Sequence, residues 1–67
     1  MNNNLYMMRV RRRLSQSELA RRAGVSRTTV CLLERRGGFP SLRVAVALCR
    51  QLECDLGEVF PIGSALR

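Results

Sequence analysis

The sequence predicts a small all-α protein that folds as one domain of five short helices. Apolar residues recur with the 3.6-residue period of a helix, and no segment shows the alternation typical of a half-buried strand. Residues with the properties of helix caps and helix stops divide the chain into short segments. With 67 residues, 46% apolar and 4% aromatic, the chain has material for one small aliphatic core. A short β-pairing between the asparagine-rich start and residues 62–66 is the only departure from helix left open.

The first two helices are predicted from their apolar faces and caps. Residues 5–13 contain good helix formers, with Leu5 and Met8 on one face. Ser15 and Glu18 have the spacing of a capping box, in which each side chain accepts a hydrogen bond from the other residue's backbone N–H. A second helix is therefore expected to begin after Ser15. Its inward-facing residues are Leu19, Ala20 and Ala23.

The third helix is expected over residues 27–35. Gly24 ends the helix before it, because glycine takes a positive φ at little cost. Ser26 then provides the N-cap, and Val30 and Leu33 lie one turn apart on the inward face.

The last two helices follow a loop at residues 37–40. Ser41 caps the fourth helix, and Asp55 caps a short fifth helix over residues 56–60 that ends before Pro61. The apolar stripe expected to face the core from the fourth helix consists of Leu42, Ala45, Leu48, Cys49 and Leu52.

The charge balance of the chain is strongly basic. Twelve arginines, with no lysine, stand against five acidic residues and give a net charge of +7. Such an excess favours a polyanionic partner, with nucleic acid ahead of an anionic membrane surface. Arginine also suits bidentate contacts with phosphate or guanine. The uncharged stretches are far shorter than the ~20 residues of a membrane helix, and no secretory signal is visible, so a cytoplasmic location is expected.

The nucleophilic and metal-binding side chains are few. Histidine is absent, and the three cysteines, Cys31, Cys49 and Cys54, form no CxxC pair. Zinc sites of cysteine and histidine are therefore excluded, as are Cys-His and Ser-His catalytic pairs. We expect no metal, no cofactor and a binding protein rather than an enzyme. The odd number of cysteines fits a reducing, intracellular setting, and redox sensing by Cys31 is the alternative to a passive small side chain.

Residues 16–34 form the most informative unit of the sequence. A turn at residues 23–26 joins two short helices and forces them to cross steeply, with Gly24 as the left-handed corner. The apolar residues that hold the second helix from below are Val25, Val30 and Leu33. Its polar first turn is then left pointing outward. This is the geometry of a helix-turn-helix, whose second helix fits into the major groove of DNA.

The same residues and their flanks closely resemble the lambda Cro and phage-repressor family, often called XRE. The matching segments include Ser15-Gln16-Ser17-Glu18-Leu19-Ala20, Ala23-Gly24-Val25-Ser26, Glu34-Arg35 and Pro40-Ser41-Leu42. The resemblance covers residues 5–60 of one domain expected to span residues 1–67, with 61–67 as a tail. It implies a five-helix, Cro-like DNA-binding domain of the small stand-alone type, of bacterial, phage or plasmid origin. Such a domain is a transcription regulator, here a repressor or autoregulator, that binds a palindromic operator as a homodimer.

The resemblance also implies roles for individual residues. The residues that would read base edges are Arg27, Thr28, Cys31 and Leu32. Arg27 suits a bidentate contact with guanine, and the Thr28 methyl group suits a thymine methyl group. The residues that would contact the DNA backbone are Gln16, Ser26, Thr29, Arg35, Arg36 and Arg43, with the helix end as a second partner for Thr29. Arg9 is expected to form an ion pair with Glu34 that ties the first helix to the third.

Several positions depart from the family pattern. Arg36 stands where the family often has glycine, and Gly37-Gly38 replace its usual basic loop residues. Leu32 stands where the family often has a polar or basic residue, and it can meet a thymine methyl group but cannot donate a hydrogen bond. Glu53 stands at a helix end where glycine or asparagine is common, and a positive φ there would strain it by ~1 kcal/mol.

Apolar residues of the fourth helix and the C-terminal segment exceed what one small core can cover. Such a surplus favours a self-association surface. The residues expected in a homodimer interface are Leu56, Val59, Phe60 and Ile62.

Two other functions compete with DNA-dependent regulation. An antitoxin-like or adaptor module would hold a protein partner, with DNA binding secondary, and an exposed apolar Leu32 favours it. RNA binding is the other, and the shortage of aromatic side chains for base stacking argues against it.

The basic run at residues 11–13 is interpreted as a solvated helix end.

Overall fold

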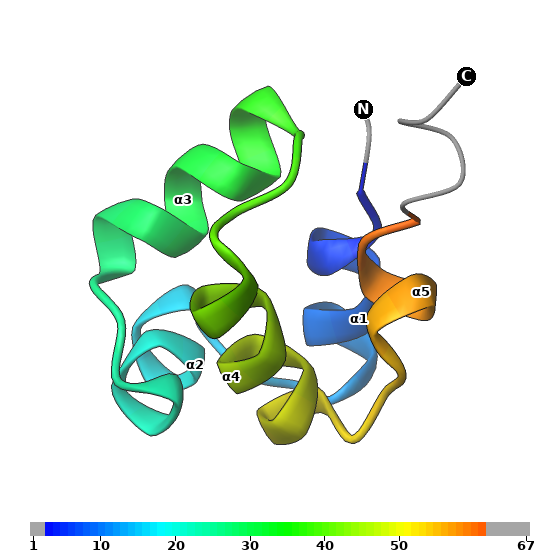
Figure 1. The fold of residues 1–67 in the computed structure, drawn as a ribbon. Coiled ribbons are helices and arrows are strands. Elements are labelled where there is room, and N and C mark those ends of the chain that lie inside the picture. Colours follow the sequence, from blue (N-terminus) through cyan, green and yellow to red (C-terminus); the bar gives the residue numbers. More distant parts are fainter. Residues whose placement is uncertain (1–2, 62–67) are drawn as a thin grey trace.

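Residues 3–61 are the part of the chain that the computed structural model describes, and they fold into five α-helices without a strand (Figure 1). The helices are α1 (Leu5–Arg11), α2 (Gln16–Ala23), α3 (Arg27–Arg36), α4 (Leu42–Leu52) and α5 (Leu56–Val59). The prediction of an all-α, five-helix fold is confirmed. None of these helices has the length and apolar character needed to cross a membrane. The β-pairing left open for residues 62–66 lies outside the described residues.

Serine caps begin the three longest helices. Glu18 N–H donates to Ser15 Oγ over 3.0 Å, and Ser15 N–H donates to Glu18 Oε1 over 3.1 Å, which completes the predicted capping box. Ser26 Oγ accepts a hydrogen bond of 3.0 Å from Thr29 N–H, and Ser41 caps α4 in the same way. Each cap satisfies a backbone donor that the first turn of a helix leaves without an intrahelical partner.

Three helix ends differ from the prediction by one or two residues. α1 ends at Arg11 rather than at residue 13, because Arg13 takes a left-handed φ of 56° where the chain turns towards α2. α3 continues to Arg36, one residue beyond the prediction, and Gly37, with a φ of 76°, is its C-cap. α5 ends at Val59, one residue early.

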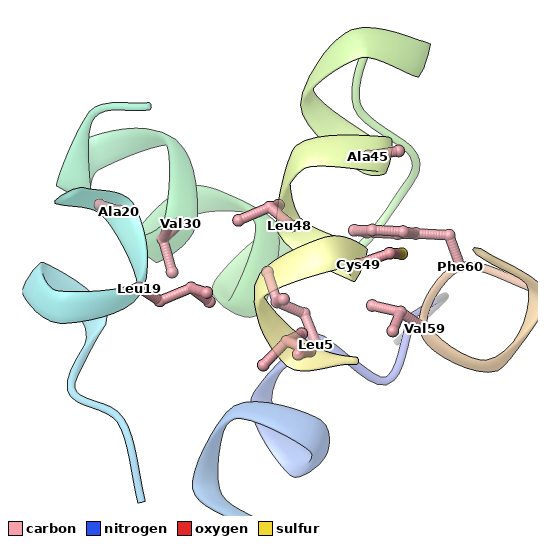
Figure 2. Close-up of a cluster of buried hydrophobic side chains, with 10 residues drawn as sticks. Leu5, Leu19, Ala20, Val30, Ala45, Leu48, Cys49, Val59 and Phe60 are labelled. Atoms are coloured by element: carbon pink, nitrogen blue, oxygen red, sulfur yellow. The ribbon is translucent and has the colours of Figure 1, made fainter. Parts of the chain in front are cut away.

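The core is built around α4, which packs against α2 and α5 (Figure 2). Its buried side chains are Leu5, Leu19, Ala20, Val30, Ala45, Leu48, Cys49, Leu52, Val59 and Phe60. Apart from Phe60 and Cys49 they are aliphatic, as the low aromatic content requires. Because full burial of one large apolar side chain contributes about 1.5–3 kcal/mol, this small set stabilises the whole fold.

Leu42 is not a core residue, contrary to the prediction. Its side chain is 63% exposed, whereas the other four members of the predicted stripe are buried. Leu42 lies on the same helical stripe as Ala45, but it is the first residue of α4 and lies beyond the edge of the core.

Val59 and Phe60 are buried in the chain's own core, so their assignment to a dimer interface is wrong. Their exposed fractions are 0% and 1%. α5 packs on α4, and the ring of Phe60 meets that of Phe39 edge-on with 5.5 Å between the ring centroids. The apolar surface of both residues is therefore used within one chain. Leu56 is half-buried, and Ile62 lies outside the described residues.

The corner between α4 and α5 is closed by a left-handed residue. Glu53 has a φ of 54°, so the condition under which strain is expected at this residue is met, and its N–H donates to Arg50 O over 3.2 Å. Cys54 N–H donates to Cys49 O over 3.1 Å, which completes the hydrogen-bond pattern of a Schellman motif.

The thiols of Cys49 and Cys54 are engaged in the packing of this corner. Burial raises the pKa of the Cys49 thiol, and Cys54 Sγ donates to Leu52 O over 3.2 Å. Both cysteines therefore act here as small packing residues.

Candidate nucleic-acid interface

Gly24 forms the corner between α2 and α3. Its φ is 72°, and Val25 N–H closes α2 by donating to Ala20 O over 3.0 Å. A Cβ added at Gly24 would meet nothing within 4 Å, so glycine is needed for its backbone conformation and not for space. This left-handed corner turns the chain from α2 into α3.

α3 presents one face to the core and the opposite face to solvent. Val30 is fully buried and Leu33 is half-buried against the core. On the other side Arg27, Thr28 and Leu32 are exposed, and Figure 1 shows α3 at the edge of the molecule. The first turn of the helix is therefore accessible to a large partner.

A shallow hollow of about 310 Å³ lies on this outer face. Its lining residues are Arg27, Thr28, Cys31, Leu32 and Arg35. The structure thus gathers the four residues expected to read base edges on one surface, and it adds Arg35, which was expected at the DNA backbone. An arginine lies at each end of the hollow, because Arg27 begins α3 and Arg35 is in its last turn.

Ser26 and Thr29 are engaged with each other at the start of α3. Their hydroxyl oxygens are 2.8 Å apart, and Ser26 Oγ also accepts the hydrogen bond from Thr29 N–H. Thr29 therefore bonds its own helix end, one of the two partners expected for it. Both residues lie at the N-terminus of α3, where free N–H groups and the helix dipole suit a phosphate.

Arg9 and Glu34 form the expected ion pair between α1 and α3. Arg9 Nε lies 2.6 Å from Glu34 Oε2, and Arg9 Nη2 lies 3.0 Å from Glu34 Oε1. Arg9 Nη1 also donates to Leu14 O over 2.6 Å. The hydrogen bond that Arg9 donates to the Glu34 carboxylate raises the pKa of Arg9, against the opposing effect of burial. The bidentate pair holds the end of α3 against α1, and the bond to Leu14 O ties both to the loop that follows α1.

Gln16 belongs to the same network, which the sequence did not reveal. Its Nε2 donates to Glu34 Oε1 over 3.1 Å. The amide expected at a DNA phosphate is therefore anchored inside the protein by one of its two protons, and the second proton has no partner among residues 3–61. Glu34 thus joins α1, the start of α2 and the end of α3.

Arg35, Arg36 and Arg43 are exposed, and none of their guanidinium groups is hydrogen-bonded to another residue within the described range 3–61. They lie in the last turn of α3 and the first turn of α4. Arg12, from the basic run, is instead 3.4 Å from Glu53 through its Nη1, in an exposed ion pair. The structure therefore leaves cationic groups free beside the end of α3.

Asn3 is a positioning residue that the sequence analysis missed. It is buried, and its Nδ2 donates to Leu33 O over 3.1 Å and to Gly38 O over 3.0 Å. Its Oδ1 accepts a hydrogen bond of 3.1 Å from Leu5 N–H at the start of α1. One side chain thus ties the beginning of the chain to the end of α3. An asparagine near an N-cap position was the only signal in the sequence.

Comparison with known proteins agrees with this arrangement. A family model described as helix-turn-helix matches residues 5–59. The uncharacterized HTH-type transcriptional regulator YgzD of Bacillus subtilis is 33% identical over 60 residues, which cover 90% of this chain and 91% of the relative. HTH-type transcriptional regulators of Archaeoglobus fulgidus and Methanocaldococcus jannaschii (MJ0272) are each 32% identical over 60 residues, covering 90% of this chain and 84% and 91% of the relatives. The chain therefore belongs to the helix-turn-helix family of the Cro and phage-repressor (XRE) type.

Proposed function

We propose that this protein is a sequence-specific regulator of transcription that reads double-stranded DNA with α3 in the major groove. The observation that carries the proposal is the outer face of α3, where Arg27, Thr28, Cys31 and Leu32 lie together and accessible. An α-helix fits the major groove, and base edges there differ for every base pair. The net charge of +7 adds attraction to the phosphates of any sequence.

The residues divide into those that select a sequence and those that position the protein. Arg27, at the exposed start of α3, has the reach and geometry for guanine O6 and N7. The free guanidinium groups of Arg35, Arg36 and Arg43 suit phosphates on either side of the groove. Gln16 can donate its second amide proton to a phosphate while the first stays on Glu34.

A homodimer on a palindromic operator is part of the proposal. Two recognition helices about 34 Å apart would read half-sites one helical turn apart, and a single small module buries too little surface to be both tight and selective. With Val59 and Phe60 buried, the exposed or half-buried apolar residues on α4 and α5 that remain for an interface are Leu42, Val44, Val46, Ala47 and Leu56. Two neighbouring hollows along α4 share Val46 and Arg50, so this surface is continuous.

Repression, including repression of the protein's own gene, is the proposed outcome of binding. A small domain that occupies promoter DNA competes with any other protein for that site. The names of the relatives, which describe them as transcriptional regulators, support a role of this kind.

The test is binding of the purified chain to the DNA upstream of its own gene and to duplexes selected from a random pool. We expect a selective shift whose affinity falls steeply with salt. Arg27→Ala should reduce the selectivity between selected and scrambled duplexes by about 10-fold or more, since one bidentate pair discriminates by about 1–3 kcal/mol. The matched control Arg11→Ala removes an equal charge from the end of α1 and should keep that selectivity. Unchanged selectivity in Arg27→Ala contradicts the proposal.

Leu32 supports a second candidate, a module that holds a protein partner. Its side chain is 37% exposed on the same face of α3, and it can bury apolar surface without donating a hydrogen bond. If the pool yields no preferred DNA sequence and the protein does not bind its upstream region selectively, this second function takes precedence.

A further inference from the structure

We propose that the first residues of α1 and the end of α5 clamp the α3–α4 loop, residues 37–41, and that Asn3 thereby positions the arginines beside this loop for DNA phosphates. The inference rests on the proposed function, because it concerns how the protein holds its contacts with the DNA backbone. The arginines are Arg36, in the last turn of α3, and Arg43, in the first turn of α4. Both are exposed.

The α3–α4 loop has little to fix its own shape. It begins with Gly37 and Gly38, whose φ values are 76° and 90°. Two glycines in succession give a chain its greatest backbone freedom. The turn of α4 that follows is also weakly packed, since Leu42 is largely exposed. The position of the loop therefore depends on residues from other parts of the chain.

Asn3 provides the polar half of the clamp. Its Nδ2 donates to Gly38 O over 3.0 Å and to Leu33 O over 3.1 Å, so one amide group bonds both the loop and the last turn of α3. Among residues 3–61, no other side chain donates a hydrogen bond to a carbonyl of the loop. Asn3 is buried, so water does not readily replace these bonds when the amide is removed.

The aromatic half of the clamp comes from the end of α5. The ring of Phe39, in the loop, meets the fully buried ring of Phe60 edge-on. The two halves are joined, because Asn4 N–H donates to Val59 O over 2.7 Å and Asn4 Nδ2 donates to Glu58 O over 2.9 Å. Figure 1 shows the start of α1 beside α5. The two segments therefore hold the loop as one unit.

The clamp acts on affinity for any DNA rather than on the choice of sequence. A loop that is already ordered places Arg36 and Arg43 before binding, so less conformational entropy is lost when they meet phosphates. Arg27 lies at the other end of α3, where Ser26 caps the helix independently of the loop. Phosphate contacts set affinity and register, whereas base contacts select the sequence.

The test measures the affinity of the full chain for a selected and a scrambled duplex over a range of salt concentrations. Asn3→Ser keeps an oxygen that can accept from Leu5 N–H but is too short to reach the two carbonyls. One phosphate contact contributes about −0.9 to the slope of log K against log[salt], or about eight-fold in affinity at about 0.1 M salt. We expect Asn3→Ser to weaken binding to both duplexes about eight-fold and to make the slope shallower by about 0.9, with their affinity ratio unchanged within about two-fold.

Two further variants separate the clamp from general stability. Asn4→Ser makes the same change at the next residue, removes the exposed side-chain bond to Glu58 O and should keep the slope. Phe39→Ala opens the aromatic half at an exposed position and should make the slope shallower as Asn3→Ser does. Circular dichroism measures the folded fraction of each variant. A merely structural role would lower that fraction at every salt concentration without changing the slope.

The outcomes separate this inference from the function on which it rests. A shallower slope in Asn3→Ser and Phe39→Ala, with Asn4→Ser unchanged, supports the clamp. An unchanged slope in either folded clamp variant overturns it, as does a loss of the affinity ratio between the duplexes without a change of slope. If the unaltered chain has no sequence preference, the proposed function fails, and the slopes on the scrambled duplex still decide whether the clamp positions the arginines.

Discussion

Gln16 Nε2 lies 3.1 Å from Glu34 Oε1, so the first residue of α2 is bonded to a residue near the end of α3. The same carboxylate holds Arg9 of α1 through two hydrogen bonds of 2.6 and 3.0 Å. Glu34 is only 7% exposed. One buried carboxylate therefore sets the position of α3 relative to both helices before it, and the angle at which α3 can meet DNA depends on it.

Glu34→Gln should lower the free energy of unfolding by about 3 kcal/mol, because it leaves the largely buried Arg9 guanidinium without an opposite charge. Urea denaturation followed by circular dichroism measures the loss. Glu53→Gln is the matched control, since it breaks only the exposed pair with Arg12 and should cost less than about 1 kcal/mol. Equal losses in the two variants contradict the role given to Glu34.

Glu53→Gly should raise the free energy of unfolding by about 1 kcal/mol, even though it removes an ion pair. The φ of 54° at Glu53 is strained for a residue with a side chain and unstrained for glycine. Gly24→Ala provides the opposite change at a φ of 72°, and it should lower stability by about 1–2 kcal/mol through backbone strain alone. Thermal denaturation of both variants tests these two predictions. If Glu53→Gly destabilises the protein, the interactions of the glutamate side chain contribute more free energy than the backbone strain costs.

The stability of the protein should fall in acid partly through Glu18. The backbone N–H of Ser15 donates to its carboxylate and holds the pKa of Glu18 below the usual value of 4.5. A folded-state pKa below the unfolded value means that the stabilisation is present above about pH 4.5 and is lost as the pH falls through the folded-state pKa. The melting temperature of Glu18→Gln should therefore decrease less between pH 6 and pH 3 than that of the unaltered protein. Parallel decreases would rule out this contribution.

Leu42→Glu should convert the proposed dimer into a folded monomer, because Leu42 is largely exposed on α4 and lies outside the core. Removing a charge from water on burial in an apolar interface costs much free energy, so association should weaken at least 10-fold. Sedimentation equilibrium measures the mass, and Met7→Glu on α1 is the control. A dimer that persists in Leu42→Glu places the interface elsewhere.

Local features of the fold could be predicted from the sequence, and features set by distant contacts could not. Ser15, Ser26 and Gly24 act on their own helix ends, so residue type and spacing were enough to place them. Burial of Phe60 depends on how α5 lies on α4, and a count of apolar residues cannot show that the core has room for it. The ion pair of Glu34 with Arg9 was expected only through the family resemblance.

The candidate site shows the same division. The exposed start of α3 follows from the helix-turn-helix spacing, and the structure gathers the expected base-reading residues on one face. The hydrogen bond from Gln16 to Glu34 joins residues 18 positions apart, and that from Asn3 to Gly38 joins residues 35 positions apart. No periodicity or local motif encodes such pairs, because they depend on the packing of whole helices.

Protection of guanine N7 from methylation is the most direct test of α3 as the element that enters the major groove, since N7 is exposed only there. The purified chain on a selected duplex should protect guanines in two patches separated by about one helical turn, 10–10.5 base pairs, on one face of the DNA. Arg27→Ala should lose protection at one guanine in each patch and keep the rest. Binding that leaves every N7 reactive, or that protects only minor-groove positions, would contradict the account.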